Sequence, residues 1–150
     1  MRTQNIIFDA SVLAKFPQSS NFFKTARDSA MGSTAYIRSH CKRIEDILYL
    51  LPLLQRKGIG IIVLSKTPAG TADVLRAFGI PYDRCVLSLD ALEGEPSDYG
   101  YVTPVDKSRK DAAKRGFKAV RFIPGAGQDA GEILALAGYR KATDHNRLTV

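Results

Sequence analysis

The sequence predicts an α/β domain with a three-layer α/β/α architecture, in which a mostly parallel five-stranded sheet lies between helices. Strand-like apolar runs alternate with helix-like segments along the chain, the order expected of strand–helix–strand units. The run IGIIVL at 59–64 is apolar on both faces, as in a parallel strand that helices cover on each side. Glycines follow the helix-like segments, at the positions where helices commonly end.

Strands are expected where short apolar runs meet turn-forming residues. The first, at 5–8, ends directly before Asp9, and the clearest, at 59–64, ends before Ser65. Three weaker runs complete the expected sheet, at 84–89, 99–102 and 118–123. The segment 90–98 between the third and fourth strands is acidic and turn-like.

The longest helix is expected to begin at Ser33 or Thr34 and to end at Gly58. Pro52 either kinks it or opens a new short helix. The apolar positions of this segment recur at helical spacing: Ile37, Cys41, Ile44, Ile47, Leu48 and Leu51. The other expected helices cover 22–31, 71–78 with Thr71 as N-cap, 107–115 and 128–137.

The size and composition indicate one globular domain over residues 1–150, with a small helical cap or insertion around 16–42. No apolar run approaches the roughly 20 residues that cross a bilayer, and the amino terminus lacks a signal-peptide pattern. The expected location is therefore the cytoplasm. Cys41 and Cys85 are too few and too far apart for a disulfide framework or a zinc site.

The formal net charge is +7 and the sequence pI is near 9.6. This charge favours an anionic partner, of which a phosphorylated small molecule is the leading choice and nucleic acid an alternative. The densest basic run, at 107–118, is typical of a solvated helix face. No membrane partner is expected.

Polar side chains follow several of the expected strands. Asp9, Ser65 with Thr67, Asp90 and Asp106 would lie along one edge of the sheet, because parallel strands carry functional groups at their carboxyl ends. Carboxylates from two strands can share Mg²⁺, and a carboxylate can also attack a phosphoryl group. Hydroxyls and helix amino termini at the same edge can hold phosphate oxygens.

The order of these parts resembles the haloacid-dehalogenase-like phosphohydrolases, which have a Rossmann-like fold. The likeness covers residues 5–123 and rests on four segments: IIFDASVL, LLQRKGIGIIVLSKT, ADVLRAFGIPYDRCVLSLD and VDKSRKDAAKRGFKAVRF. The resemblance implies that Asp9 attacks phosphorus, that a phosphoaspartate forms, and that water releases it with the help of Mg²⁺. It implies these roles: catalytic, Asp9, Ser11 and Lys107 (or Lys110); substrate-binding, Ser65, Lys66 and Thr67; metal-binding, Asp9, Asp106 and Asp111.

The chain departs from the family pattern in three respects. The stretch between the third and fourth expected strands is too short for the helix that usually carries the family's motif lysine. Asp9-Ala10-Ser11 stands where the family has Asp-x-Asp, and a serine hydroxyl cannot act as the general acid/base at neutral pH. Pro104-Val105-Asp106 stands where the family has Gly-Asp or Asp-Asp. A weakened or inactive phosphohydrolase is therefore also compatible with the sequence.

Two other classes of function remain open. IIFDASVL also fits the Asp-x-Ser motif of PIN-domain ribonucleases, in which Glu45, Asp90 and Asp106 would join Asp9 around Mg²⁺ and the basic charge would suit RNA. The third class is a degenerate α/β domain that binds a partner without catalysis. Phe22, Phe23, Tyr36 and the apolar run ILYLLPLL would then supply an interface.

Overall fold

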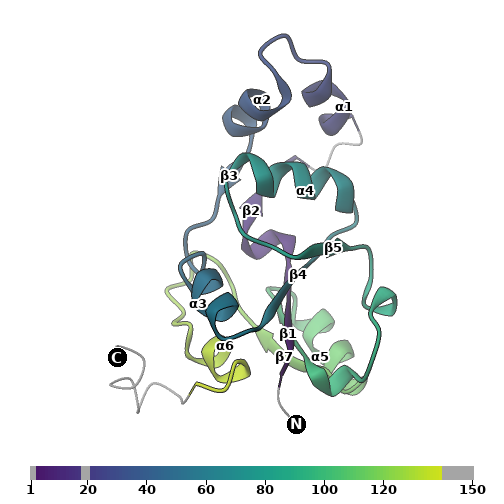
Figure 1. Cartoon of the computed structure of the whole chain (residues 1–150), viewed down its shortest axis with the longest axis vertical. Helices are drawn as coiled ribbons and strands as arrows, with labels where there is room; N and C mark the ends of the chain where they lie inside the picture. Colours follow the sequence, from purple (N-terminus) through teal and green to yellow (C-terminus); the bar gives the residue numbers. More distant parts are fainter. Residues whose placement is uncertain (1–2, 18–20, 140–150) are drawn as a thin grey trace.

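The computed structural model describes residues 3–17 and 21–139. Five strands form one sheet in the order β5–β4–β1–β6–β7, and each neighbouring pair is parallel (Figure 1). Helices flank this sheet, so the predicted α/β fold with a parallel five-stranded sheet is confirmed. The strands are β1 (Asn5–Asp9), β4 (Gly60–Leu64), β5 (Arg84–Val86), β6 (Tyr99–Thr103) and β7 (Lys118–Arg121).

The central strand β1 is buried on both faces. Its side chains alternate: Ile6 and Phe8 join the larger core cluster, and Ile7 joins a second cluster on the opposite face. The larger cluster includes residues of α3, α4 and α6, and the second includes Ala112 of α5. The main described helices are α1 (Phe22–Arg27), α2 (Ser33–His40), α3 (Leu50–Arg56), α4 (Pro68–Ala77), α5 (Asp106–Lys114) and α6 (Gly131–Leu136), with short 3₁₀ turns η1 (Ala10–Val12), η2 (Leu89–Ala91) and η3 (Pro96–Asp98).

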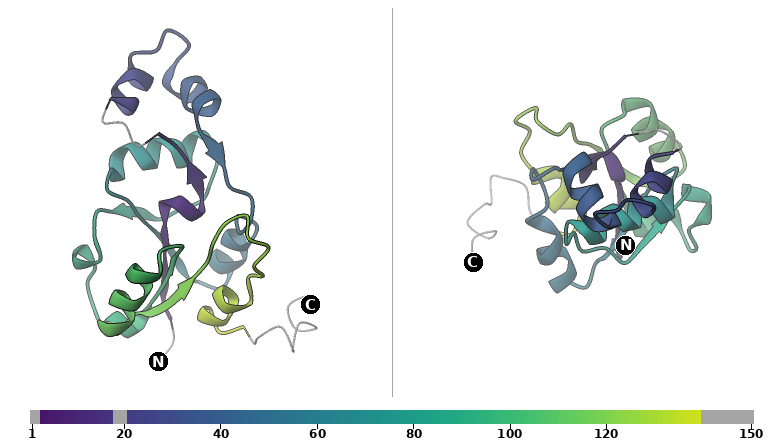
Figure 2. Two further views of the ribbon diagram at one scale, coloured as in Figure 1. Left: turned by 180° about the vertical axis from the view of Figure 1, so that it is seen from behind. Right: turned by 90° about the horizontal axis from the view of Figure 1, so that it is seen from above.

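A small helical segment is inserted after β1. The strands β2 (Ala14–Lys15) and β3 (Lys42–Arg43) pair antiparallel, and α1 and α2 lie between them in the sequence. Both helices therefore fall within residues 16–42, for which the sequence predicts a cap or insertion. They lie at the end of the molecule opposite the amino terminus, beyond α4 (Figures 1 and 2).

The inserted helices dock on α4. The ring of Phe23 lies so close to Gly70 that a Cβ atom there would meet it at 2.5 Å. The guanidinium Nε of Arg38 donates a hydrogen bond of 2.7 Å to the carbonyl oxygen of Ala77. An apolar cluster that includes Phe22, Ile37 and Val74 fills the contact. The insertion is thus packed against the helix that follows β4.

The structure corrects the expected long helix at 33–58. Cys41 has an extended backbone (φ −115°, ψ 162°), so α2 ends at His40, and α3 begins only at Leu50. The apolar residues behind the expectation belong to different clusters: Ile37 packs against α4, whereas Leu48 and Leu51 pack under the sheet. The helical spacing came from two separate short helices and the segment between them.

Several element ends also differ from the sequence-based expectation. α1 stops at Arg27, and β5 stops at Val86. α4 begins at Pro68, because proline is favoured in the first turn of a helix, and its N-cap residue is therefore Thr67 and not the expected Thr71. α6 begins later than 128, because the Gln128 side chain instead bonds the backbone of residues 121 and 123.

None of the helices within the described ranges 3–17 and 21–139 combines the length and apolar character needed to span a bilayer.

Candidate functional site

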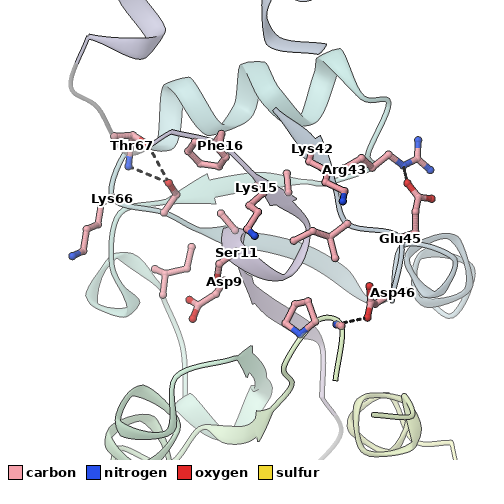
Figure 3. Close-up of a pocket in the computed structure, with 17 residues that line it drawn as sticks. Asp9, Ser11, Lys15, Phe16, Lys42, Arg43, Glu45, Asp46, Lys66 and Thr67 are labelled. Carbon is pink, nitrogen blue, oxygen red and sulfur yellow. Dashed lines mark hydrogen bonds and ion pairs between the residues drawn. The ribbon is translucent and has the colours of Figure 1, made fainter. Parts of the chain in front are cut away.

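A cavity of about 780 Å³ opens at the carboxyl ends of β1 and β4 (Figure 3). Its wall combines residues from the sheet, the β2–β3 ribbon and the segment after it, the loop between β4 and α4, and the loop after β7. The polar lining consists of three acids, four basic residues and three hydroxyl residues: Asp9, Glu45, Asp46, Lys15, Lys42, Arg43, Lys66, Ser11, Ser65 and Thr67. The site therefore lies at the sheet edge that the sequence predicts.

Asp9 lies at the floor of this cavity, at the last position of β1. The hydroxyl of Tyr101, from the neighbouring strand β6, donates a hydrogen bond of 2.8 Å to its Oδ1 atom. Burial raises the pKa of the Asp9 carboxyl, and hydrogen bonds with Thr103 and Tyr101 oppose part of this effect. Asp9 is thus a half-buried carboxyl group held by two hydroxyl side chains of β6.

The hydroxyl groups after β4 form a connected group at the amino end of α4. The Ser65 hydroxyl lies 2.6 Å from that of Thr71 and 3.4 Å from that of Thr67. The backbone N–H of Thr67 donates to Ser65 Oγ at 3.1 Å. Because backbone N–H groups at a helix start lack intrahelical partners, this corner of the cavity favours an anion. All three predicted substrate-binding residues, Ser65, Lys66 and Thr67, line the cavity.

The predicted metal ligands on α5 do not line the cavity. Asp106 is the first residue of α5, and its carboxylate bonds to side chains of its own helix, with Arg109 Nη2 at 2.9 Å and Lys110 Nζ at 3.2 Å. These two basic groups lower the pKa of Asp106. Asp111 and Lys107 are exposed on the same helix and also lie outside the cavity.

These positions bear on the predicted magnesium site. Within residues 3–17 and 21–139, no three His, Cys, Asp or Glu side chains group closely enough to hold a metal ion. Asp9 faces hydroxyl groups, and Asp106 faces its own helix. The positions of Asp9, Asp106 and Asp111 in the structure therefore do not fit the shared magnesium site that the family resemblance implies.

Two residues beside Asp9, Tyr101 and Thr103, were not predicted from the sequence. Phe8 pairs with Val102 in the β1–β6 register, so Thr103 is the β6 residue that follows this pair, next to Asp9. Thr103 is fully buried, and Tyr101 is 3% exposed. Tyr101 resembles an ordinary core aromatic in the sequence. The parity of the two strands was the available signal, since alternate residues of parallel neighbours share a face.

Four basic residues surround the cavity. Arg43 forms an ion pair with Glu45 at 2.7 Å and donates to the Phe78 carbonyl oxygen at 3.1 Å. Lys15, Lys42 and Lys66 form no ion pair with any acid in the part of the chain that the structure describes. In Figure 3, Lys66 lies at the opposite side of the cavity from Lys42 and Arg43, and Lys15 lies at its centre. Of these, the sequence pointed only to Lys66.

The acids expected of the alternative nuclease site also do not all lie in the cavity. Glu45 lines the same cavity as Asp9, but its carboxylate bonds to Arg43. Asp90 pairs with Arg115 at 2.7 Å, outside the cavity. Among the described residues, the exposed large apolar side chains include only Tyr49 of the segments expected to supply a binding interface; the others are Met31, Leu87, Val105 and Ile123.

The sequence was also compared with known proteins. No model of a protein family matches this chain, and no curated protein matches its sequence.

Proposed function

We propose that this chain is a haloacid-dehalogenase-like domain that binds a phosphorylated small molecule in the cavity at the carboxyl edge of its sheet. One observation carries the proposal: a single cavity is lined by Asp9, by the hydroxyls of Ser65 and Thr67, and by Lys66 between them in the sequence. The likeness in the order of strands, hydroxyls and acids supports the family assignment.

The corner after β4 suits the phosphoryl group. Ser65 and Thr67 offer hydroxyl donors, and Lys66 adds a positive charge beside them. α4, a helix of ten residues, begins directly after this corner, so the positive end of its dipole lies near it. Hydrogen bonds from charged donors to phosphate oxygens are shorter and stronger than those between neutral groups.

Asp9 is the proposed nucleophile for phosphoryl transfer. Its carboxylate oxygen would bond to phosphorus as the bond to the leaving-group oxygen breaks, and water would then hydrolyse the phosphoaspartate. The Tyr101 hydroxyl occupies Oδ1 of Asp9, and Ser11 stands where an acid would protonate the leaving group. We therefore propose that the site binds phosphomonoesters but hydrolyses them slowly. A requirement for Mg²⁺ stays a prediction.

The test compares wild type with Asp9→Asn in two assays. Calorimetry with a generic phosphomonoester measures binding, and phosphate release with and without Mg²⁺ measures turnover. We expect wild type to bind the ester and release phosphate slowly, and Asp9→Asn to bind it while losing release at least about a hundredfold. Asp28→Asn, at the exposed end of α1, is the matched control.

Failure of wild type to bind phosphomonoesters, with Mg²⁺ present or absent, would contradict the proposal. RNA cleavage lost in Glu45→Gln would instead favour the nuclease class.

A further inference from the structure

Two lysines face each other where the chain enters and leaves the helical insertion. In the antiparallel β2–β3 ribbon, Lys15 is directly opposite Lys42. Side chains at opposed positions of an antiparallel pair project from the same face, with Cβ atoms roughly 5 Å apart. Both side chains are exposed and line the cavity described above. Two positive charges are therefore held together on one wall of it.

This arrangement does not serve the stability of the ribbon. Like charges directly opposite each other across two strands are destabilising. The neighbouring acids are already engaged: Glu45 bonds to Arg43, and Asp46 accepts a hydrogen bond from the backbone N–H of Gly125. Neither lysine has an acidic partner among the residues described by the structure. The pair is thus a concentration of positive charge open to an anion from solution.

The cavity is also larger than a phosphate ion needs. Its volume of about 780 Å³ falls within the range of sites that enclose whole organic ligands, roughly 300–1,000 Å³. Ala14, Phe16 and Ile44 add apolar surface to the wall that carries the two lysines. The Phe16 ring is supported by Phe23, with their centroids 5.8 Å apart. The lining therefore suits a ligand with a carbon skeleton.

We propose that Lys15 and Lys42 bind a second anionic group of the ligand, separate from the phosphoryl group at Ser65 and Thr67. The ligand is accordingly an organic phosphate that carries another phosphate or a carboxylate, joined to the first by an apolar segment that contacts Phe16. This inference rests on the proposed function for the phosphoryl end. The lysine wall and the Ser65–Thr67 corner belong to separate segments of the chain, the β2–β3 ribbon and the loop between β4 and α4.

Calorimetry with three matched probes tests the proposal: butyl phosphate, butanediol bisphosphate and a phosphorylated hydroxybutyrate. Wild type is expected to bind the two probes with a second anionic group roughly tenfold more tightly than butyl phosphate, the effect of about one charge-assisted hydrogen bond. The order of these two probes distinguishes a phosphate from a carboxylate at the second position.

The variants Lys15→Gln and Lys42→Gln should erase this preference while leaving butyl phosphate binding unchanged. Lys24→Gln, exposed on the same insertion and outside the cavity, should retain it. Because the two lysines repel each other, both glutamine variants should unfold at the same temperature as wild type or slightly higher. Thermal unfolding thus checks that the variants are folded.

Equal affinity of wild type for all three probes would overturn the second subsite and leave the proposed function intact. Equal weakening of every probe by the glutamine variants would also overturn it, because the lysines would then hold the phosphoryl group itself. If wild type bound none of the probes, the proposed function and this inference would fall together.

Discussion

β4 and β6 flank β1 on its two sides, and the chain that follows each strand meets Asp9 differently. After β4, the polar groups turn into the cavity: Ser65, Lys66 and Thr67 line it, and α4 begins there. After β6, the first acid is Asp106, and its carboxylate bonds to Arg109 and Lys110 of its own helix. What β6 offers to Asp9 is the hydroxyls of Tyr101 and Thr103.

This difference separates two tasks that share one sheet edge. The β4 side has one cation, two hydroxyls and the amino end of a helix, which suit recognition of an anion. The β6 side holds the Asp9 carboxyl in place and brings no further carboxylate to the cavity. Recognition and positioning thus have separate residues, so substitutions on the two sides should have separable effects.

The largest expected effect is on stability, at the contact between the insertion and α4, the helix that follows β4. Gly70→Leu places a side chain where the Phe23 ring already lies, so the insertion must move away from α4. We expect the free energy of unfolding to fall by about 3 kcal/mol, the upper end of the usual overpacking range. Urea denaturation measures it.

Ala69→Leu, at the exposed neighbouring position of α4, is the control and should cost little. Phe23→Ala should largely rescue Gly70→Leu, because it removes the clashing ring. Additive losses in the double variant would show that the two residues do not collide.

The next effect tests the β6 side. Tyr101→Phe removes the hydroxyl that donates to Asp9, which leaves a half-buried carboxylate with one fewer donor. We expect a loss of about 1.5 kcal/mol at neutral pH, the lower end for a hydrogen bond to a charged group. The loss should shrink as the pH falls through the pKa of Asp9, because the bond to the neutral carboxyl is weaker. The exposed Tyr49→Phe should change little.

A smaller effect is expected from the charge of Asp9 itself. Burial raises its pKa in the folded chain above the unfolded value, so the folded state binds the proton more tightly. The stability that this shift contributes is present at low pH and is lost as the pH rises through the folded pKa. Asp9→Asn should therefore unfold at a higher temperature than wild type near neutral pH, and the difference should vanish under acidic conditions. A constant difference across the pH range would show that the charge of Asp9 is not the cause.

The smallest effect on ligand affinity is expected at Asp106. Asp106→Asn should leave the affinity for a phosphomonoester unchanged, because this residue lies outside the cavity, while Ser65→Ala weakens it several-fold. Calorimetry with both variants compares the two sides of the site directly. Equal weakening would mean that α5 takes part in binding after all.

The sheet edge was predictable from the sequence because it depends on buried strands. IIF and GIIVL are apolar enough to be central strands, and parallel strands end at a common edge. The sequence therefore predicted that Asp9 and Ser65 lie at the same edge of the sheet. The lysine pair could not be predicted in this way. β2 and β3 are two residues long, which is too short for a periodic pattern, and their pairing depends on how the whole insertion folds back.

The orientation of Asp106 also required the structure. An acid at the start of a helix can face a site, or it can pair with basic residues three and four positions later. Arg109 and Lys110 occupy these positions, but their mere presence does not decide which partner the carboxylate takes. Tyr101 shows the same limit: a buried strand tyrosine reads as core until the neighbouring strand is placed beside it.

The insertion can also be regarded as one very long hairpin loop, because both of its ends meet in the β2–β3 ribbon. The entropy of closing a flexible loop rises slowly with its length, by only about 0.6 kcal/mol for each doubling. Residues could therefore be added at low cost in the connection 28–32 between α1 and α2, which is mostly exposed, as long as the two helices keep their contact with α4. The length of the chain can change at this point without disturbing the sheet that holds Asp9.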